Sequence, residues 1–172
     1  MDITIGSARI NDKNDIYGGE PGDNKQTGNP DYNGEVSMQK FYTSKDRKWL
    51  IFRPKDAKDA NAIADKMITA CNNKNVGYGQ DGRLQIINNG VSTNKATECD
   101  CSSLVRACIK EGTGKDPGNF TTSNAPTVLK KSGLFNKKQT YISDLKTPLY
   151  TGDVLLTSPN GHAAIVTNGN SR

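Results

Sequence analysis

The sequence lacks any long hydrophobic run. Nowhere in its 172 residues does it hold the roughly 18 apolar residues in succession that a membrane-spanning helix needs. The N-terminal segment MDITIGSARI also lacks the basic region and apolar stretch of a signal peptide. With 33% hydrophobic residues and a mean hydropathy of −0.71, we expect a soluble, loop-rich protein with a modest core.

Histidine and cysteine are scarce. His162 is the only histidine, and four cysteines are too few to staple a chain of this length with disulfides. No second cluster of these residues completes a zinc site, so neither a metal nor another cofactor is expected. A disulfide between Cys99 and Cys101 would close a very tight, strained ring. The remaining cysteines are Cys71 and Cys108.

The charge balance is mildly basic. Lys and Arg number 23 against 18 Asp and Glu, which gives a net charge of +5. The basic residues are dispersed and form no stripe interleaved with aromatic residues, so nucleic acid is not an expected partner. A surface charged for solubility explains this balance, and a polyanionic partner such as a cell wall also fits it.

Residues 11–34 are rich in Gly, Asn, Asp and Pro, which predicts a loop within one domain. Part of this loop resembles an EF-hand calcium loop, but Lys40 stands where the bidentate Glu belongs. A turn-rich loop is the better interpretation, and calcium binding by residues 29–40 stays open. The matching ligand positions are Asn29, Asp31, Asn33 and Gly34.

Periodicity predicts an α+β fold, because the helices precede most of the strands instead of alternating with them. A strand pair is expected at 35–42 and 48–53, and later strands at 152–157 and 162–167. Helices are expected at 55–73, at 101–111 with Gly112 at its end, and at 124–132 with Asn124 as its cap. A short turn is expected at 84–88. We predict one domain over 1–172, divided into 1–54, a helical part 55–133 and a sheet part 134–172.

The stretch ECDCSSLVRACIK singles out one cysteine. Asp100 is placed to cap a helix whose first turn contains Cys101, where unpaired N–H groups and the helix dipole favour an anion. We therefore expect a lowered pKa for the Cys101 thiol. Cys99 lies outside this helix, whereas Cys71 and Cys108 lie on apolar helix faces and are expected in the core. Only Cys101 occupies the position of a nucleophile.

His162 opens a predicted strand just after a Pro-Asn-Gly turn. From that position it could reach a neighbouring helix end and serve a thiol as base. An ordinary surface histidine beside a turn explains the spacing equally well.

The motifs DCSSLVR, TGDVLLT and GHAAIV, in this order, resemble the NlpC-type and CHAP-type peptidoglycan hydrolases, which are papain-like cysteine peptidases and amidases. The resemblance covers about residues 97–168. The intervening GNFTTSNAPTVLKKSGLF is similar to catalytic domains of phage and prophage endolysins from Gram-positive hosts. It implies a papain-like fold in which the nucleophile-bearing helix packs on an antiparallel sheet. Cys101 matches the nucleophile, His162 the base and Asp153 the Gly-Asp motif.

The resemblance implies a lysin that hydrolyses an amide bond of peptidoglycan as an amidase or an endopeptidase, without a cofactor. The backbone N–H of Cys101 would stabilise the oxyanion. Asp100 and Ser102 could contact the substrate peptide, although helix capping is the favoured role of Asp100. Which bond is cut stays open.

The third catalytic position departs from the family pattern. The family carries it on the strand after the histidine strand, but few residues follow His162. We expect the N-terminal strand GEVSMQKFY to take that place, with Gln39 or Glu35 orienting the imidazole. Both could equally be polar residues on the exposed side of a strand.

The biological setting is expected to be that of a phage lysin. Such a protein is made in the host cytoplasm without a signal peptide and reaches the wall through a holin, with no insertion of its own into the membrane. A separate or missing C-terminal module would bind the wall. The competing hypotheses are a non-catalytic wall- or phage-associated binding domain and an amidase that acts on a different amide.

Overall fold

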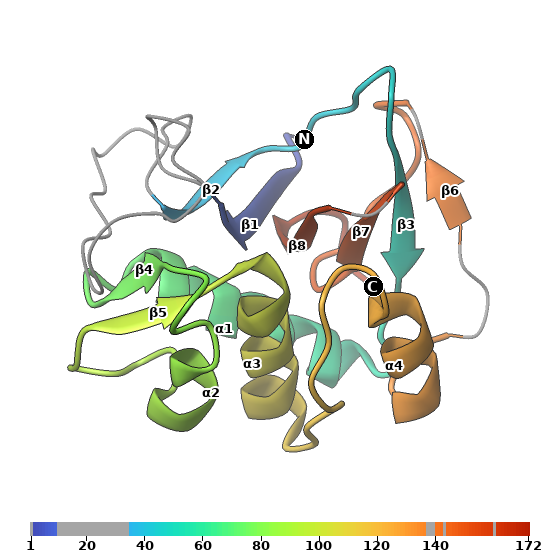
Figure 1. Ribbon diagram of the computed structural model, residues 1–172. Coiled ribbons are helices and arrows are strands. Elements are labelled where there is room, and N and C mark those ends of the chain that lie inside the picture. The colour runs from blue at the N-terminus through green and yellow to red at the C-terminus, as the bar shows by residue number, and fades with distance from the viewer. Residues whose placement is uncertain (1, 10–34, 137–139, 143, 160) are drawn as a thin grey trace.

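The computed structural model describes residues 2–9, 35–136, 140–142, 144–159 and 161–172 (Figure 1). It confirms the predicted α+β class. Within these ranges no helix combines the length and the apolar character needed to cross a bilayer. The strands are β1 (Thr4–Ala8), β2 (Val36–Lys40), β3 (Lys48–Phe52), β4 (Val76–Tyr78), β5 (Thr97–Cys99), β6 (Thr140–Ile142), β7 (Val154–Ser158) and β8 (Ala163–Asn168). The helices are α1 (Ala57–Cys71), α2 (Gln85–Asn89), α3 (Cys101–Thr113) and α4 (Ala125–Ser132).

Six strands form an antiparallel sheet in the order β2-β1-β8-β7-β3-β6. The predicted strands at 35–42 and 48–53 both exist, but they do not pair with each other. β2 pairs with β1, whereas β3 lies between β7 and β6 on the other side of the sheet. Alternating side chains predict a strand but not its partner, because every pairing of β3 is with a segment distant in sequence.

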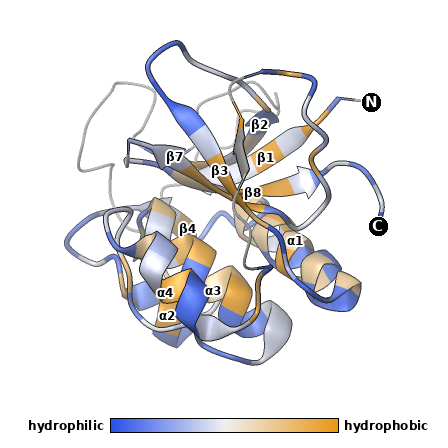
Figure 2. Cartoon of the chain, turned by 90° about the vertical axis from the view of Figure 1, so that its right-hand side faces the viewer, coloured by the Kyte–Doolittle hydropathy of each residue, from blue (hydrophilic) through white to orange (hydrophobic). Residues whose placement is uncertain are grey.

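Hydrophobic side chains cover both faces of this sheet. In β3, Leu50 and Phe52 join the core under the helices, whereas Trp49 and Ile51 join a second cluster on the opposite face. Helices α1 and α3 pack against β1 and β8 on the first face. Figure 2 shows hydrophobic residues along the central strands and the helices, and hydrophilic residues in the connecting turns. The apolar side of α3 therefore packs against the inner strands β1 and β8.

Gly112 does not end its helix as predicted. It lies inside α3, where an added Cβ would come within 2.8 Å of the backbone nitrogen of Ile63 on α1. The residue is therefore needed for the close approach of the two helices. The helix ends instead at Gly114, whose φ of +79° is left-handed.

Asn124 occupies the N-cap position of α4, but its side chain does not cap the helix. Its carboxamide oxygen accepts a hydrogen bond from the Thr121 N–H at 2.8 Å instead. The calcium-like positions 29–34 lie outside the described residues.

Strands β4 and β5 form a separate parallel pair that the sequence did not predict. Tyr78 at the end of β4 lies opposite Cys99 at the end of β5, two residues before the start of α3. The pair therefore brings Tyr78 close to the first turn of α3. Gly77 and Gly79, which flank Tyr78 in sequence, obscured the strand in a segment that resembles a loop.

Candidate active site

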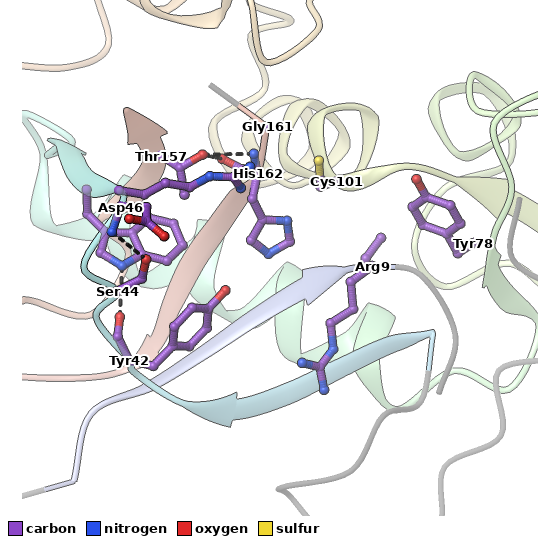
Figure 3. Close-up of a pocket in the computed structure, with 12 residues that line it drawn as sticks. Arg9, Tyr42, Ser44, Asp46, Tyr78, Cys101, Thr157, Gly161 and His162 are labelled. Carbon is purple, nitrogen blue, oxygen red and sulfur yellow. Dashed lines mark hydrogen bonds between the residues drawn. The ribbon is translucent and has the colours of Figure 1, made fainter. Parts of the chain in front are cut away.

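Cys101 and His162 lie on the wall of one cavity of about 550 Å³. Figure 3 shows Cys101 and His162 among the lining residues, with Arg9, Tyr42 and Tyr78 around them. Both Cys101 and His162 are half-buried, so the cavity exposes part of each residue to solvent. The described residues that line it are Ala8, Arg9, Tyr42, Ser44, Asp46, Arg47, Trp49, Tyr78, Cys101, Thr157, Gly161 and His162.

The first turn of α3 is fixed by a capping box. The Asp100 carboxylate accepts a hydrogen bond from the Ser103 N–H at 2.8 Å, and the Ser103 hydroxyl accepts one from the Asp100 N–H at 2.9 Å. The predicted capping role of Asp100 is therefore confirmed. This arrangement holds the backbone of Cys101 in a fixed orientation at the helix start.

Arg83 ties the same helix start to the rest of the chain. Its guanidinium forms an ion pair with Asp100 at 2.7 Å and donates to the Ser102 hydroxyl at 3.1 Å and the Phe120 carbonyl at 2.8 Å. Asp100 and Ser102 are buried and do not line the cavity. Their geometry supports holding α3, and their contact with substrate stays a prediction.

His162 is positioned by the β7–β8 hairpin. The Thr157 N–H donates to the His162 carbonyl at 3.0 Å, and the His162 N–H donates to the Thr157 hydroxyl at 3.0 Å. The imidazole lies edge-on to the Trp49 indole, with ring centroids 6.2 Å apart. Within the described part of the chain, the imidazole makes no hydrogen bond, so backbone bonding and packing hold it.

The strand beside β8 is an N-terminal strand, but it is β1 and not the predicted GEVSMQKFY segment of β2. Ile5 lies opposite Val166 and Gly6 opposite Ile165. Continuing this antiparallel register brings Arg9 to His162 at the same edge of the sheet. The chain segment before residue 10 was too short and too mixed in character to be placed next to β8 from sequence.

Gln39 and Glu35 both lie one strand further out and do not line the cavity. The Gln39 carboxamide oxygen accepts a hydrogen bond from the guanidinium of Arg9, which is itself a cavity residue. The buried Glu35 carboxylate accepts a hydrogen bond from the Tyr78 N–H at 3.0 Å. An orienting role for either residue stays a prediction.

The electrostatics differ from the sequence-based expectation for Cys101. Burial, followed by the negative charge of Asp100, raises the pKa of its thiol to about 11, although backbone hydrogen bonding from Ala163 opposes both. The predicted lowering of this pKa is wrong, because burial outweighs the effect of the helix start. Burial, followed by the charges of Arg9 and Arg47, lowers the pKa of His162 to about 4. Both shifts favour a neutral thiol and a neutral imidazole at neutral pH.

Asp153 is not among the described residues that line the cavity. Its carboxylate is fully buried and accepts hydrogen bonds from Arg53 at 2.9 and 2.8 Å and from the Tyr150 N–H at 2.9 Å. The Gly152 before it has a φ of +91°, and a Cβ there would lie 2.2 Å from the Ala60 carbonyl oxygen. The Gly-Asp motif therefore joins β7 to α1 and to the chain after β3.

A family model described as the endolysin-like domain matches residues 5–172. The chain belongs to this family. The match spans both the cavity and the sheet, and it supports a cell-wall-lytic hydrolase. No curated protein and no solved structure matches the chain. In the described part of this endolysin-like domain, no group of three or more His, Cys, Asp and Glu residues is arranged to hold a metal ion.

Five large side chains of the cavity in this endolysin-like domain were not predicted from the sequence. Three are aromatic and two are basic, and all come from segments whose position relative to Cys101 could not be inferred from the sequence. Trp49 belongs to the WLIF run that was correctly predicted as a strand, and Tyr78 to the GYGQDG segment taken as a loop. The five residues are Arg9, Tyr42, Arg47, Trp49 and Tyr78.

We expect alkylation of Cys101 by iodoacetamide to accelerate about tenfold per pH unit from pH 6 to pH 9. Only the thiolate reacts, and a thiol with a pKa of about 11 gains thiolate throughout this range. Mass spectrometry of the labelled native endolysin-like domain measures the rate, and Cys101→Ala is the control because the other three cysteines are buried. A rate that stays constant from pH 6 upward would instead show a preformed thiolate–imidazolium pair.

Proposed function

We propose that this endolysin-like domain hydrolyses an amide bond of peptidoglycan through Cys101 and His162, on a papain-like (NlpC/CHAP-type) fold. One observation carries the proposal: a capped helix and a β-hairpin bring the only histidine and the only partly exposed cysteine to one cavity. Family membership supports the wall as the target. The motif resemblance supports the amide bond and the cysteine mechanism, for an amidase and an endopeptidase alike.

The neutral pair defines the first step. The Cys101 sulfur attacks the amide carbonyl carbon while its proton passes to the His162 imidazole, which is an available base at neutral pH. The imidazolium then donates this proton to the leaving amine as the C–N bond breaks, which leaves a thioester. A water molecule, deprotonated by His162, attacks the thioester, and the thiol leaves with the proton.

The N-terminus of α3 supports the charge that develops on the carbonyl oxygen. The backbone N–H of Cys101 lies in the first turn, where no intrahelical acceptor is available. We propose this N–H as an oxyanion donor. The capping box and Arg83 would keep it aligned, which gives Asp100 and Ser102 positioning roles.

Purified Gram-positive cell walls test the proposal. Turbidity loss in the presence of the protein, together with new muropeptides whose mass increases by one water per cut, is the expected result. Mass spectrometry of these products also distinguishes an amidase from an endopeptidase. Wall binding without any new product would favour a non-catalytic binding domain, and cleavage confined to non-wall amides would favour the other alternative.

We also propose that Gln39 or Glu35 orients the His162 imidazole. At least one of Gln39→Ala and Glu35→Ala is then expected to lower kcat about tenfold with little change in KM, because the base loses alignment but the cavity keeps its shape. Lys40→Ala is the matched control, since Lys40 is an exposed neighbour on β2. Full activity of both variants would exclude a catalytic role for this strand.

A further inference from the structure

Two arginines are among the described residues that line the cavity, and the proposed hydrolysis requires neither of them. Arg9, which follows β1, and Arg47, which precedes β3, both line it. The one acidic lining residue is Asp46, and in the described part of the chain it forms no ion pair with either arginine. Arg47 is therefore the lining cation whose contacts within the described residues need explanation.

Arg47 lies directly beside the base. It is exposed, and its guanidinium packs against Gly161, where an added Cβ would come within 3.2–3.4 Å of the guanidinium atoms. Gly161 precedes His162 in the chain. Across the residues that the structure describes, the Arg47 guanidinium makes no hydrogen bond or ion pair, whereas Arg9 already donates to Gln39. Arg47 thus lines the cavity with donors that have no acceptor within the described part of the chain.

We propose that this cavity binds a peptide with a free carboxylate next to the scissile amide, and that Arg47 holds that carboxylate. The inference rests on the proposed function, because it places the amide between Cys101 and His162. The planar fork of a guanidinium matches both oxygens of a carboxylate. The aromatic residues Tyr42, Trp49 and Tyr78 also line the cavity and suit the apolar parts of a peptide. After burial, the charges of Arg9 and Arg47 lower the pKa of His162, so their field reaches the reacting groups.

Two synthetic tripeptides test the proposal, acetyl-Ala-γ-Glu-Lys and the same peptide with the glutamate carboxylate amidated. Binding is measured in the Cys101→Ala protein, which avoids turnover, by the fluorescence of Trp49, the only tryptophan and a cavity residue. The free carboxylate is expected to improve the Kd at least about tenfold over its amide. Arg47→Gln should abolish this preference. Lys45→Gln is the matched control, because Lys45 is an exposed cation of the same loop outside the cavity lining.

Loss of the preference in Arg47→Gln together with its retention in Lys45→Gln supports the proposal. Equal binding of the two peptides, no binding of either, or an unchanged preference in Arg47→Gln overturns it. The wall-lysis assay keeps this outcome separate from the proposed function. A wild-type protein that clears walls but ignores the carboxylate refutes only the role of Arg47, whereas a protein that binds the carboxylate and clears no wall refutes only the hydrolysis.

Discussion

Cys101→Ala is expected to abolish wall lysis, lowering the rate at least about a thousandfold, while the protein keeps its fold. The substitution removes the only cavity thiol, and without it no thioester can form. The fold should persist because Cys101 is half-buried at the helix start and its side chain is small. Turbidity loss of purified walls measures the activity, and circular dichroism with a thermal melt measures the fold.

Cys99→Ala is the matched control for this experiment. Cys99 lies two residues before Cys101, at the end of β5. It is buried, and its sulfur lies 3.6 Å from the carbonyl oxygen of Gly77 on β4. This variant should lose about 1 kcal/mol of stability and keep its activity. His162→Ala should match Cys101→Ala, and the double variant should be no slower than either single one, because the two groups act as a unit. Lysis that survives in Cys101→Ala would exclude the cysteine mechanism.

The sequence predicted the parts of this site that depend on local structure. A helix cap, a helix start and a strand start are each encoded within a few residues, and Asp100, Cys101 and His162 were located in this way. The partners of His162 could not be predicted, because they depend on which strands pair. β1 and β3 flank the β7–β8 hairpin on either side, and they bring Arg9 and Trp49 to the cavity that His162 lines. The parallel pairing of β4 with β5 similarly brings Tyr78 to the cavity.

The pKa values of Cys101 and His162 could not be predicted from the sequence either. The helix start at Cys101 is a local feature that favours a thiolate. The burial that overrides it arises only when the chain packs around Cys101. A nucleophile position can therefore be inferred from spacing, whereas its pKa requires the packed structure.

Asp153→Ala is expected to destabilise the protein by about 3 kcal/mol without a catalytic defect in the folded fraction. The Asp153 carboxylate is fully buried, and its loss leaves the Arg53 guanidinium and the Tyr150 N–H without this acceptor. The Arg53 guanidinium carbon also lies 4.4 Å from the centroid of the Tyr150 ring, so Asp153 holds Arg53 and Tyr150 together. Urea denaturation measures the loss, and wall lysis well below the melting temperature measures the activity.

Asp116→Ala provides the matched comparison, since Asp116 forms an equally short ion pair with Arg106 but its side chain is 33% exposed. Hydrogen bonding to Arg106 lowers the pKa of Asp116 to about 2, so the pair contributes above the ordinary pKa of an Asp and is lost as the pH falls toward 2. Solvent screening should limit the effect of Asp116→Ala at pH 7 to about 1 kcal/mol.

If folded Asp153→Ala were inactive, the Gly-Asp motif would act in catalysis. The geometry instead assigns the motif to the junction of α1 with β7, the strand that pairs with β8 in the hairpin that positions His162.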